Sequence, residues 1–126
     1  MASIREIADQ LVGYCRTGDT ATGLKELYAA DAVSIEAAVM PGVDSAETKG
    51  IEGIRGKHEW WESNFEYHGG NVDGPYMHGE NQFGVIFEMD VTEKASGTRS
   101  QEKEMAIYTV ENGKICREQF YYTMPG

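Results

Sequence analysis

The 126-residue sequence predicts an α+β protein, with helices in its first half and a curved antiparallel sheet in its second. In most of residues 2–66, apolar side chains recur every three or four positions, which is the spacing of one helix face. In residues 71–124 they recur at every second position, which is typical of strands. A sheet with one apolar face must bury that face, so we expect it to curl around three N-terminal helices.

The first two helices are predicted to form a hairpin. Residues 2–17 carry one apolar stripe, made of Ile4, Ile7, Ala8, Leu11, Tyr14 and Cys15. The segment Thr17-Gly18-Asp19-Thr20 then supplies a glycine stop and polar capping residues. We therefore expect a short second helix over Thr22–Ala30.

A third helix is predicted over Gly53–Glu66. Its apolar positions follow spacings of four, three and four, and they are Ile54, His58, Trp61 and Phe65. This spacing places a histidine on the apolar face. The glycines of His68-Gly69-Gly70 are expected to end the helix.

The strands are predicted from alternation and from turn residues. A first strand is expected over Asp31–Ala38, and the segment Met40–Gly50, rich in Pro, Gly, Ser and Thr, is expected to be a loop. Asn112-Gly113 is a strong hairpin signal. It separates the last two members of a predicted four-strand meander, whose ranges are Asn71–His78, Phe83–Glu93, Arg99–Glu111 and Lys114–Met124.

Length and charge limit the function. The length fits a single domain spanning residues 1–126. A net charge of −10 repels nucleic-acid backbones and anionic lipid, so neither nucleic acid nor membrane is an expected partner. The N-terminal segment is charged where a secretory signal is apolar, which favours a cytoplasmic location. Cys15 and Cys116 are far apart and lack a metal-binding motif, so both are expected to be free thiols.

Two motifs carry a resemblance to a known family. The segment Leu27–Glu36, LYAADAVSIE, resembles the "LFADDAVxxD" stretch of nuclear-transport-factor-two-like domains. The segment Tyr108–Ile115, YTVENGKI, followed by Phe120-Tyr121-Tyr122, resembles their "FRFxDGKI…YY" ending. Together with the order of elements, these motifs are most similar to the SnoaL-like branch, which includes polyketide cyclases and is related to ketosteroid isomerases. The resemblance implies a cone-shaped domain around one small, largely apolar pocket.

The resemblance carries over to only some residues. Glu36 falls where ketosteroid isomerases have a general-base carboxylate. Their two oxyanion-hole positions correspond here to Leu11 and Ala106, neither of which donates a side-chain hydrogen bond, so steroid isomerisation is not expected. The ending Tyr121-Tyr122-Thr123 also lacks the acid of the family's "YYD".

The predicted site combines these positions with strand alternation. Glu104 shares a face with Tyr108, and Glu118 shares one with Phe120, so both acids face inward if the aromatic rings do. The predicted catalytic residues are Glu36 as base and His58 as its partner acid or orienting group. The predicted pocket is lined by Tyr14, Trp61, Tyr76, Glu104, Tyr108, Glu118, Phe120 and Tyr122.

Two functions remain open at this stage. The first is an enzyme, of isomerase, cyclase or dehydratase type, that moves a proton on a small hydrophobic carbonyl compound by acid/base catalysis. The second is a non-catalytic module that binds a hydrophobic ligand or dimerises. We expect no metal and no cofactor, because no set of metal-ligand residues is spaced to form a site. A homodimer is expected from apolar residues on the outer sheet face, Ile86, Met105 and Ile107.

Overall fold

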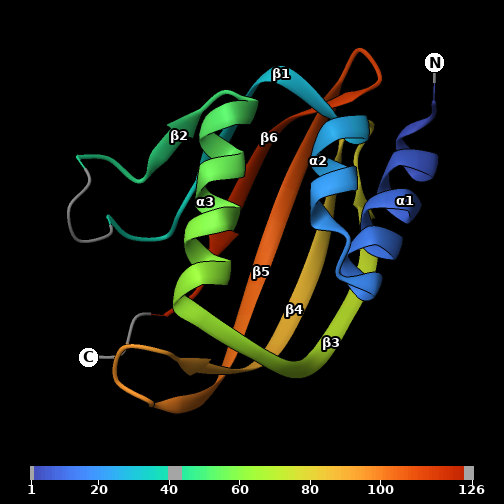
Figure 1. Ribbon diagram of the computed structural model, residues 1–126. Helices are drawn as coiled ribbons and strands as arrows, with labels where there is room; N and C mark the ends of the chain where they lie inside the picture. The colour runs from blue at the N-terminus through green and yellow to red at the C-terminus, as the bar shows by residue number, and fades with distance from the viewer. Residues whose placement is uncertain (1, 40–43, 124–126) are drawn as a thin grey trace.

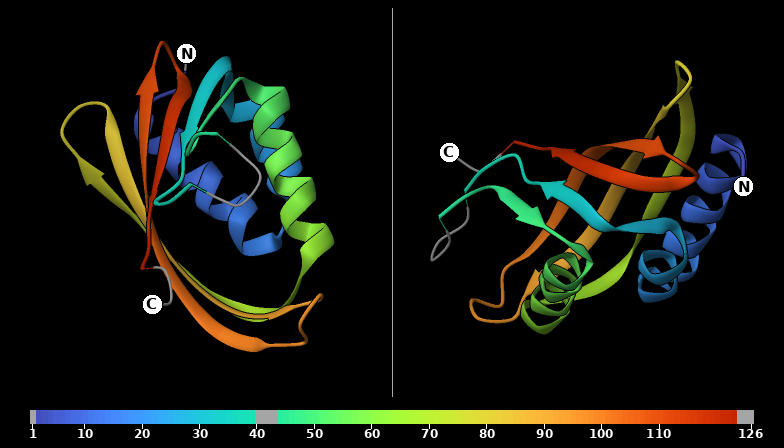
Figure 2. Two further views of the ribbon diagram at one scale, coloured as in Figure 1. Left: turned by 90° about the vertical axis from the view of Figure 1, so that its left-hand side faces the viewer. Right: turned by 90° about the horizontal axis from the view of Figure 1, so that it is seen from above.

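A computed structural model describes residues 2–39 and 44–123 and contains three helices and six strands in these ranges. The helices are α1 (Ile4–Thr17), α2 (Thr20–Leu27) and α3 (Ile51–Asn64). The strands are β1 (Tyr28–Ile35), β2 (Glu47–Lys49), β3 (Phe65–His78), β4 (Gln82–Glu93), β5 (Arg99–Glu111) and β6 (Lys114–Tyr121). All three helices lie on the concave side of one curved sheet (Figures 1 and 2). None of them has the length and hydropathy of a membrane span, as far as the described residues go.

Helix α1 begins and ends at residues that satisfy its free backbone groups. The Ser3 hydroxyl accepts from the Glu6 backbone amide, and the Glu6 carboxylate accepts from the Ser3 amide, which is a complete capping box. Gly18 ends the helix in the left-handed conformation, at φ 76°. The predicted range of this helix is therefore correct within two residues.

The six-stranded sheet is mixed, in the order β2-β1-β6-β5-β4-β3. Four of its five ladders are antiparallel, among them the three of the predicted meander, but β1 pairs with β6 in parallel. Strand β2 lies in a segment predicted to be a loop, and it pairs with β1 through Thr48 and Ser34. A three-residue edge strand in polar sequence offers too few alternating positions to be recognised. The predicted last strand ends at Met124, which lies outside the described residues.

Strand β3 is longer than predicted, because Gly69 and Gly70 lie within it and do not end α3. The helix ends at Asn64, and β3 begins at Phe65. A Cβ atom on Gly70 would lie 1.9 Å from the carbonyl oxygen of Glu88 in β4. Glycine is required here by the close approach of two strands, where the sequence pattern suggested a helix terminus.

The core lies between the helices and the concave sheet face. Its members include Ile7, Leu11, Leu27, Ile54, Phe83, Val85, Ala106, Tyr108 and Ile115. Leu11 and Ala106, at the positions of the isomerase oxyanion hole, are both buried within this core. Side chains that alternate with the core residues in β4 and β5 point to the convex face, which none of the three helices of the described ranges covers (Figure 2).

Candidate functional site

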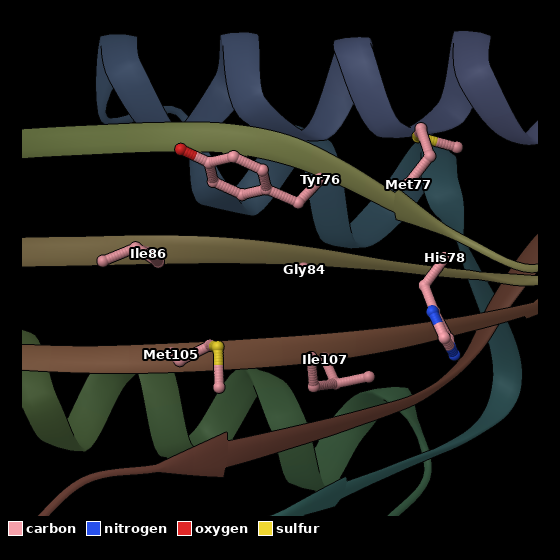
Figure 3. A pocket seen from close by; sticks show the side chains of 7 residues that line it. All are labelled: Tyr76, Met77, His78, Gly84, Ile86, Met105 and Ile107. Carbon is pink, nitrogen blue, oxygen red and sulfur yellow. The ribbon is translucent and has the colours of Figure 1, made fainter.

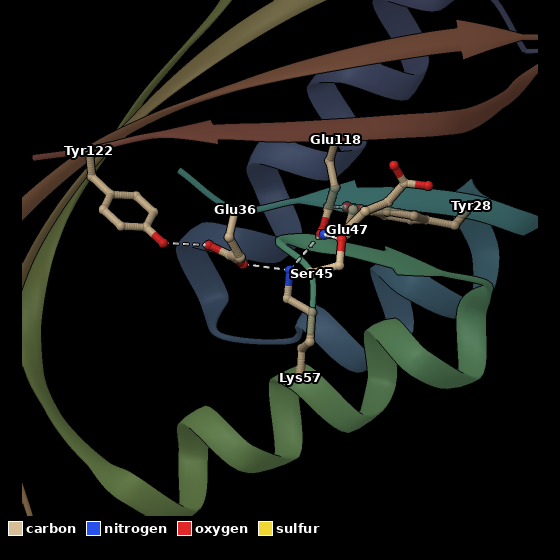
Figure 4. A network of polar contacts seen from close by, with 8 residues as sticks. Tyr28, Glu36, Ser45, Glu47, Lys57, Glu118 and Tyr122 are labelled. Carbon is tan, nitrogen blue, oxygen red and sulfur yellow. Dashed lines mark hydrogen bonds and ion pairs between the residues drawn. The ribbon is translucent and has the colours of Figure 1, made fainter. Parts of the chain in front are cut away.

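Polar side chains gather on the concave face where β1, β6 and α3 meet. The parallel ladder pairs Ser34 of β1 with Glu118 of β6. Glu36 and Tyr122 follow directly after these two strands, and Lys57 extends from α3 toward them (Figure 4). The register of one ladder and the position of one helix therefore bring these groups together.

The carboxylate of Glu36 is held by two donors from different elements. The Lys57 ammonium lies 2.5 Å from Oε1, and the Tyr122 hydroxyl donates to Oε2 over 2.9 Å. The side chains of Lys57 and Glu36 are 24% and 22% exposed. The ion pair is thus partly shielded and yet reachable from solvent. Burial, together with the neighbouring Glu36 carboxylate, raises the pKa of the Tyr122 hydroxyl well above its usual value.

A second arm of the cluster runs from Lys57 into the core. Its ammonium donates to the Ser34 hydroxyl over 2.7 Å, and that hydroxyl donates to Glu118 over 2.6 Å. The Tyr28 hydroxyl donates to the other oxygen of Glu118. Glu118 is 2% exposed, and its two hydroxyl donors supply the hydrogen bonds that a buried carboxylate requires.

Glu104 is a third acid close to this cluster. It lies on the inner face of β5, where alternation with Tyr108 placed it. Burial, with smaller contributions from Glu36 and Glu118, raises the pKa of the Glu104 carboxyl to about 7, and nearby Lys57 partly offsets this. A carboxyl with such a pKa can both take up and release a proton near neutral pH.

Aromatic rings border the cluster on one side. The Lys57 ammonium lies 5.5 Å from the centre of the Phe120 ring, within the range of a cation–π contact. Trp61, one turn beyond Lys57 on α3, stacks on Phe65 with ring centres 5.5 Å apart. The predicted pocket residues Glu104, Glu118, Phe120 and Tyr122 therefore converge on the same face as Glu36.

His58 occupies a different position from the one expected for a partner of Glu36. It is half-buried on α3, and in the described ranges no hydrogen bond joins it to Glu36, whose partners are Lys57 and Tyr122. Neighbouring positions on a helix point about 100° apart, so the side chain that meets Glu36 changes when the helix position shifts by one residue, and here that side chain is Lys57.

Tyr108 borders the cluster from the core side: it pairs with Glu118 across the β5–β6 ladder and stacks on Phe83. Two other predicted pocket residues lie elsewhere. Tyr14 donates to Glu26 between the first two helices. Tyr76 lies on the convex face, together with Ile86 and other residues of an apolar cavity of about 370 Å³ (Figure 3). The register of β3 shifts between Asp73 and Tyr76, so simple alternation does not predict which face the Tyr76 ring takes.

Lys57, Ser34 and Tyr28 are site residues that the sequence analysis missed. Lys57 stands three residues after Ile54 and four before Trp61, so it lies on the apolar stripe of α3. A lysine is unusual on the apolar face of a helix, so this pattern could have identified Lys57 as a candidate site residue. Ser34 likewise alternates with Ala32 and Glu36 in β1, which indicates an inward-facing hydroxyl.

No group of three His, Cys, Asp or Glu side chains in residues 2–39 and 44–123 has the arrangement of a metal site. The only cation in contact with Glu36 in these ranges is the Lys57 ammonium. The carboxylates, the ammonium and the hydroxyl groups of the cluster can transfer protons and form hydrogen bonds with a bound molecule.

Comparison with known proteins identifies the family. The sequence profile of the SnoaL-like domain matches residues 2–122, nearly the whole chain. The chain belongs to the SnoaL-like domain family. A solved structure from Mesorhizobium loti, of a candidate SnoaL-like polyketide cyclase, is 43% identical and has a TM-score of 0.89. The match covers 96% of this chain and 100% of that one.

More distant solved structures share the fold alone. A candidate polyketide cyclase from Pseudomonas putida is 15% identical, with a TM-score of 0.71 over 98% of this chain and 94% of that one. A protein with a ketosteroid isomerase-like fold from Catenulispora acidiphila is 18% identical, with a TM-score of 0.72 over 94% and 86%. None of the curated proteins compared matches the chain.

Proposed function

We propose that this SnoaL-like domain is an enzyme that moves a proton on a small hydrophobic carbonyl compound by acid/base catalysis. The observation that carries the proposal is the partly buried Glu36 carboxylate between the Lys57 ammonium and the Tyr122 hydroxyl, at 2.5 and 2.9 Å. The Lys57 ammonium and the Tyr122 hydroxyl both contact the Glu36 carboxylate. Another carboxyl group, that of Glu104, lies close by. A pocket that only bound an apolar ligand would need just apolar walls and one polar anchor.

The cluster holds both kinds of group that enolate chemistry requires. A carboxylate must remove a proton from the carbon next to the carbonyl, and a donor must stabilise the oxygen that becomes negative. Glu36 is the base by its position, and Glu104 can accept or return the proton because its pKa is raised to about 7. Lys57 and Tyr122 are the donors closest to Glu36 and can turn to a substrate oxygen.

The surroundings support a small hydrophobic substrate. Phe120, whose ring centre lies 5.5 Å from the Lys57 ammonium, is a half-buried aromatic side chain suited to contact with a flat or alicyclic ring, and half-buried Trp61 follows one turn after Lys57 on α3. The similar protein from Mesorhizobium loti is named as a candidate polyketide cyclase, and polyketides are carbonyl compounds. For this chain, the class of substrate is part of the proposal.

An exchange experiment tests the proposal before any natural substrate is known. The protein would be incubated in D₂O with a panel of cyclic ketones and aromatic polyketide-like ketones, and deuterium uptake beside the carbonyl would be followed by NMR. We expect exchange above the buffer rate for at least one compound. Lys57→Met should reduce that exchange by about 10²-fold, the usual size of the loss of one oxyanion donor.

The control is Lys103→Met, which removes an exposed lysine that pairs across the sheet with Glu88 on the convex face. This variant should exchange deuterium at the wild-type rate. The proposal is wrong if no ketone exchanges faster than in buffer, or if both lysine variants lose the same activity.

The convex face favours a second function, that of a dimerisation module. It exposes large apolar side chains around the 370 Å³ cavity, among them Met105 at 42% and Tyr76 at 52% exposure. Contiguous apolar surface of this kind is typical of an interaction site. We propose that a second copy of the chain covers it, and the two functions are compatible because they use opposite faces of the sheet.

A further inference from the structure

We propose that Glu118 is a positioning residue which, through Ser34, fixes the Lys57 ammonium beside Glu36. This proposal rests on the proposed function, in which Lys57 is one of the two hydrogen-bond donors to the substrate oxygen. The geometry itself is independent of any substrate. Among the described residues, the side-chain hydrogen bonds of Glu118 go to Tyr28 and Ser34 and not to Glu36, so its effect on Lys57 passes through Ser34 (Figure 4).

The direction of each hydrogen bond is fixed by proton count. A serine hydroxyl has one proton, and Ser34 donates it to Glu118. The Ser34 oxygen is then an acceptor toward Lys57, and Lys57 must donate. In this arm, Lys57 therefore donates to Ser34, and Ser34 donates to Glu118.

Lys57 consequently bridges two carboxylates. It contacts Glu36 directly at 2.5 Å and reaches Glu118 through one hydroxyl. These contacts occupy two of the three N–H groups of an ammonium, and the third is left for the Phe120 side or for a substrate oxygen. A flexible lysine with four side-chain torsions is thereby held at one point, which is what an oxyanion donor requires.

Burial of Glu118 has a cost that packing alone does not explain. A carboxylate that is 2% exposed loses its hydration, and an apolar side chain at this position would avoid the loss. Ser34, fully buried, and Tyr28, 7% exposed, supply two hydroxyl groups that compensate the carboxylate. Only one of these two hydroxyls continues to Lys57, and this asymmetry provides the test.

The two hydroxyls allow a matched pair of variants. Ser34→Ala and Tyr28→Phe each remove one donor from Glu118, but only Ser34→Ala breaks the link to Lys57. A merely structural role of Glu118 predicts similar consequences for both variants. A positioning role predicts a change at Lys57 in Ser34→Ala and in Glu118→Gln, and none in Tyr28→Phe.

The readout is the rate at which Lys57 reacts with trace acetic anhydride at fixed pH, measured by mass spectrometry of the peptide that contains it. Only the neutral amine reacts, so a site that holds the ammonium slows the reaction. We expect labelling of Lys57 to rise about tenfold in Ser34→Ala and Glu118→Gln, because the ammonium loses a hydrogen-bonded link that holds it. Labelling of exposed Lys103 should stay constant in every variant and serves as the internal reference.

Two outcomes overturn the proposal. One is unchanged labelling of Lys57 in Ser34→Ala. This variant only shortens a side chain, so it still tests the proposal if Glu118→Gln does not fold. The other is an equal rise in Tyr28→Phe, which would indicate general loosening of the core. Because labelling needs no substrate, it separates the two proposals: altered labelling without any ketone exchange would support positioning and contradict the proposed function.

Discussion

The two faces of the sheet are built from the same strands and yet differ in kind. The concave face carries a buried core and a hydrogen-bonded polar cluster in which Glu36, Lys57 and Glu118 all have partners. The convex face carries apolar side chains without a cover, including Met105 and Tyr121. Neighbouring residues of one strand point to opposite faces of the sheet, so the polar cluster and the exposed apolar surface are built from alternate positions of the same strands. A change on one face should leave the other intact, and this can be tested.

The largest effect is expected on the concave face, at Glu36. Glu36→Gln keeps the shape of the side chain but removes the base, so ketone exchange should fall by about 10²–10⁴. Glu88→Gln, an exposed glutamate that faces the other way on β4, is the control and should keep the wild-type rate. Equal losses in both variants would mean that the charge of the whole protein matters and not the cluster.

Substitutions on the two faces should differ in how much they lower the stability of the protomer. Phe83 is fully buried and stacks on Tyr108 with ring centres 5.0 Å apart. Phe83→Ala should lower the free energy of unfolding by about 3–5 kcal/mol. Tyr121→Ala on the convex face should cost the protomer less than about 1 kcal/mol. Urea unfolding at low protein concentration measures both, and similar losses would show that the convex face also packs within the protomer.

Glu104 should make stability depend on pH. Burial raises its pKa from 4.5 to about 7, so the folded protein binds this proton more tightly than the unfolded chain does. The stabilisation is fully present below about pH 4.5 and is lost as the pH rises through 7, a change of roughly 1–3 kcal/mol. Urea unfolding from pH 4 to pH 8 would measure it. In Glu104→Gln this part of the pH dependence should disappear, and an unchanged profile would contradict the assignment.

The smallest effect on the protomer is expected from Met105→Glu. This charge lies on the convex face beside the cavity, so unfolding at low concentration should change by less than about 0.5 kcal/mol. Self-association should weaken at least tenfold, about 1.4 kcal/mol, as sedimentation at micromolar concentrations would report. A wild-type protein that sediments as a monomer there would rule out the proposed dimer.

Periodicity predicted most of the fold. The ranges of α1, β4 and β5 agree with the prediction within two residues, because long amphipathic segments repeat their pattern many times. Where local and tertiary requirements differ, the prediction was wrong. Gly70 resembles a helix stop in sequence, and only the approach of Glu88 from β4 explains it. The parallel pairing of β1 with β6 joins segments that no local pattern connects.

The candidate site was predictable in its parts and not in its contacts. Alternation placed Glu104 and Glu118 on the inner face, and the resemblance drew attention to Glu36. The partner expected for Glu36 was His58, because a histidine is the usual proton carrier near neutral pH. The rotation of α3 about its axis decides between adjacent residues, and that rotation is set by packing against the sheet. Sequence spacing alone could not decide between Lys57 and His58.

The parallel ladder between β1 and β6 also has a consequence for the newly made chain. Ser34 and Glu118 are 84 positions apart, and Glu36 and Tyr122 are 86 apart. During synthesis, the earlier residue of each pair leaves the ribosome before the later one has been made. The edge of β1 that pairs with β6 is therefore unpaired until β6 has been synthesised. Contacts of such high sequence separation also slow folding. The contact of Ser34 with Glu118 and that of Glu36 with Tyr122 therefore cannot form until the segment that contains β6 and Tyr122 has been synthesised.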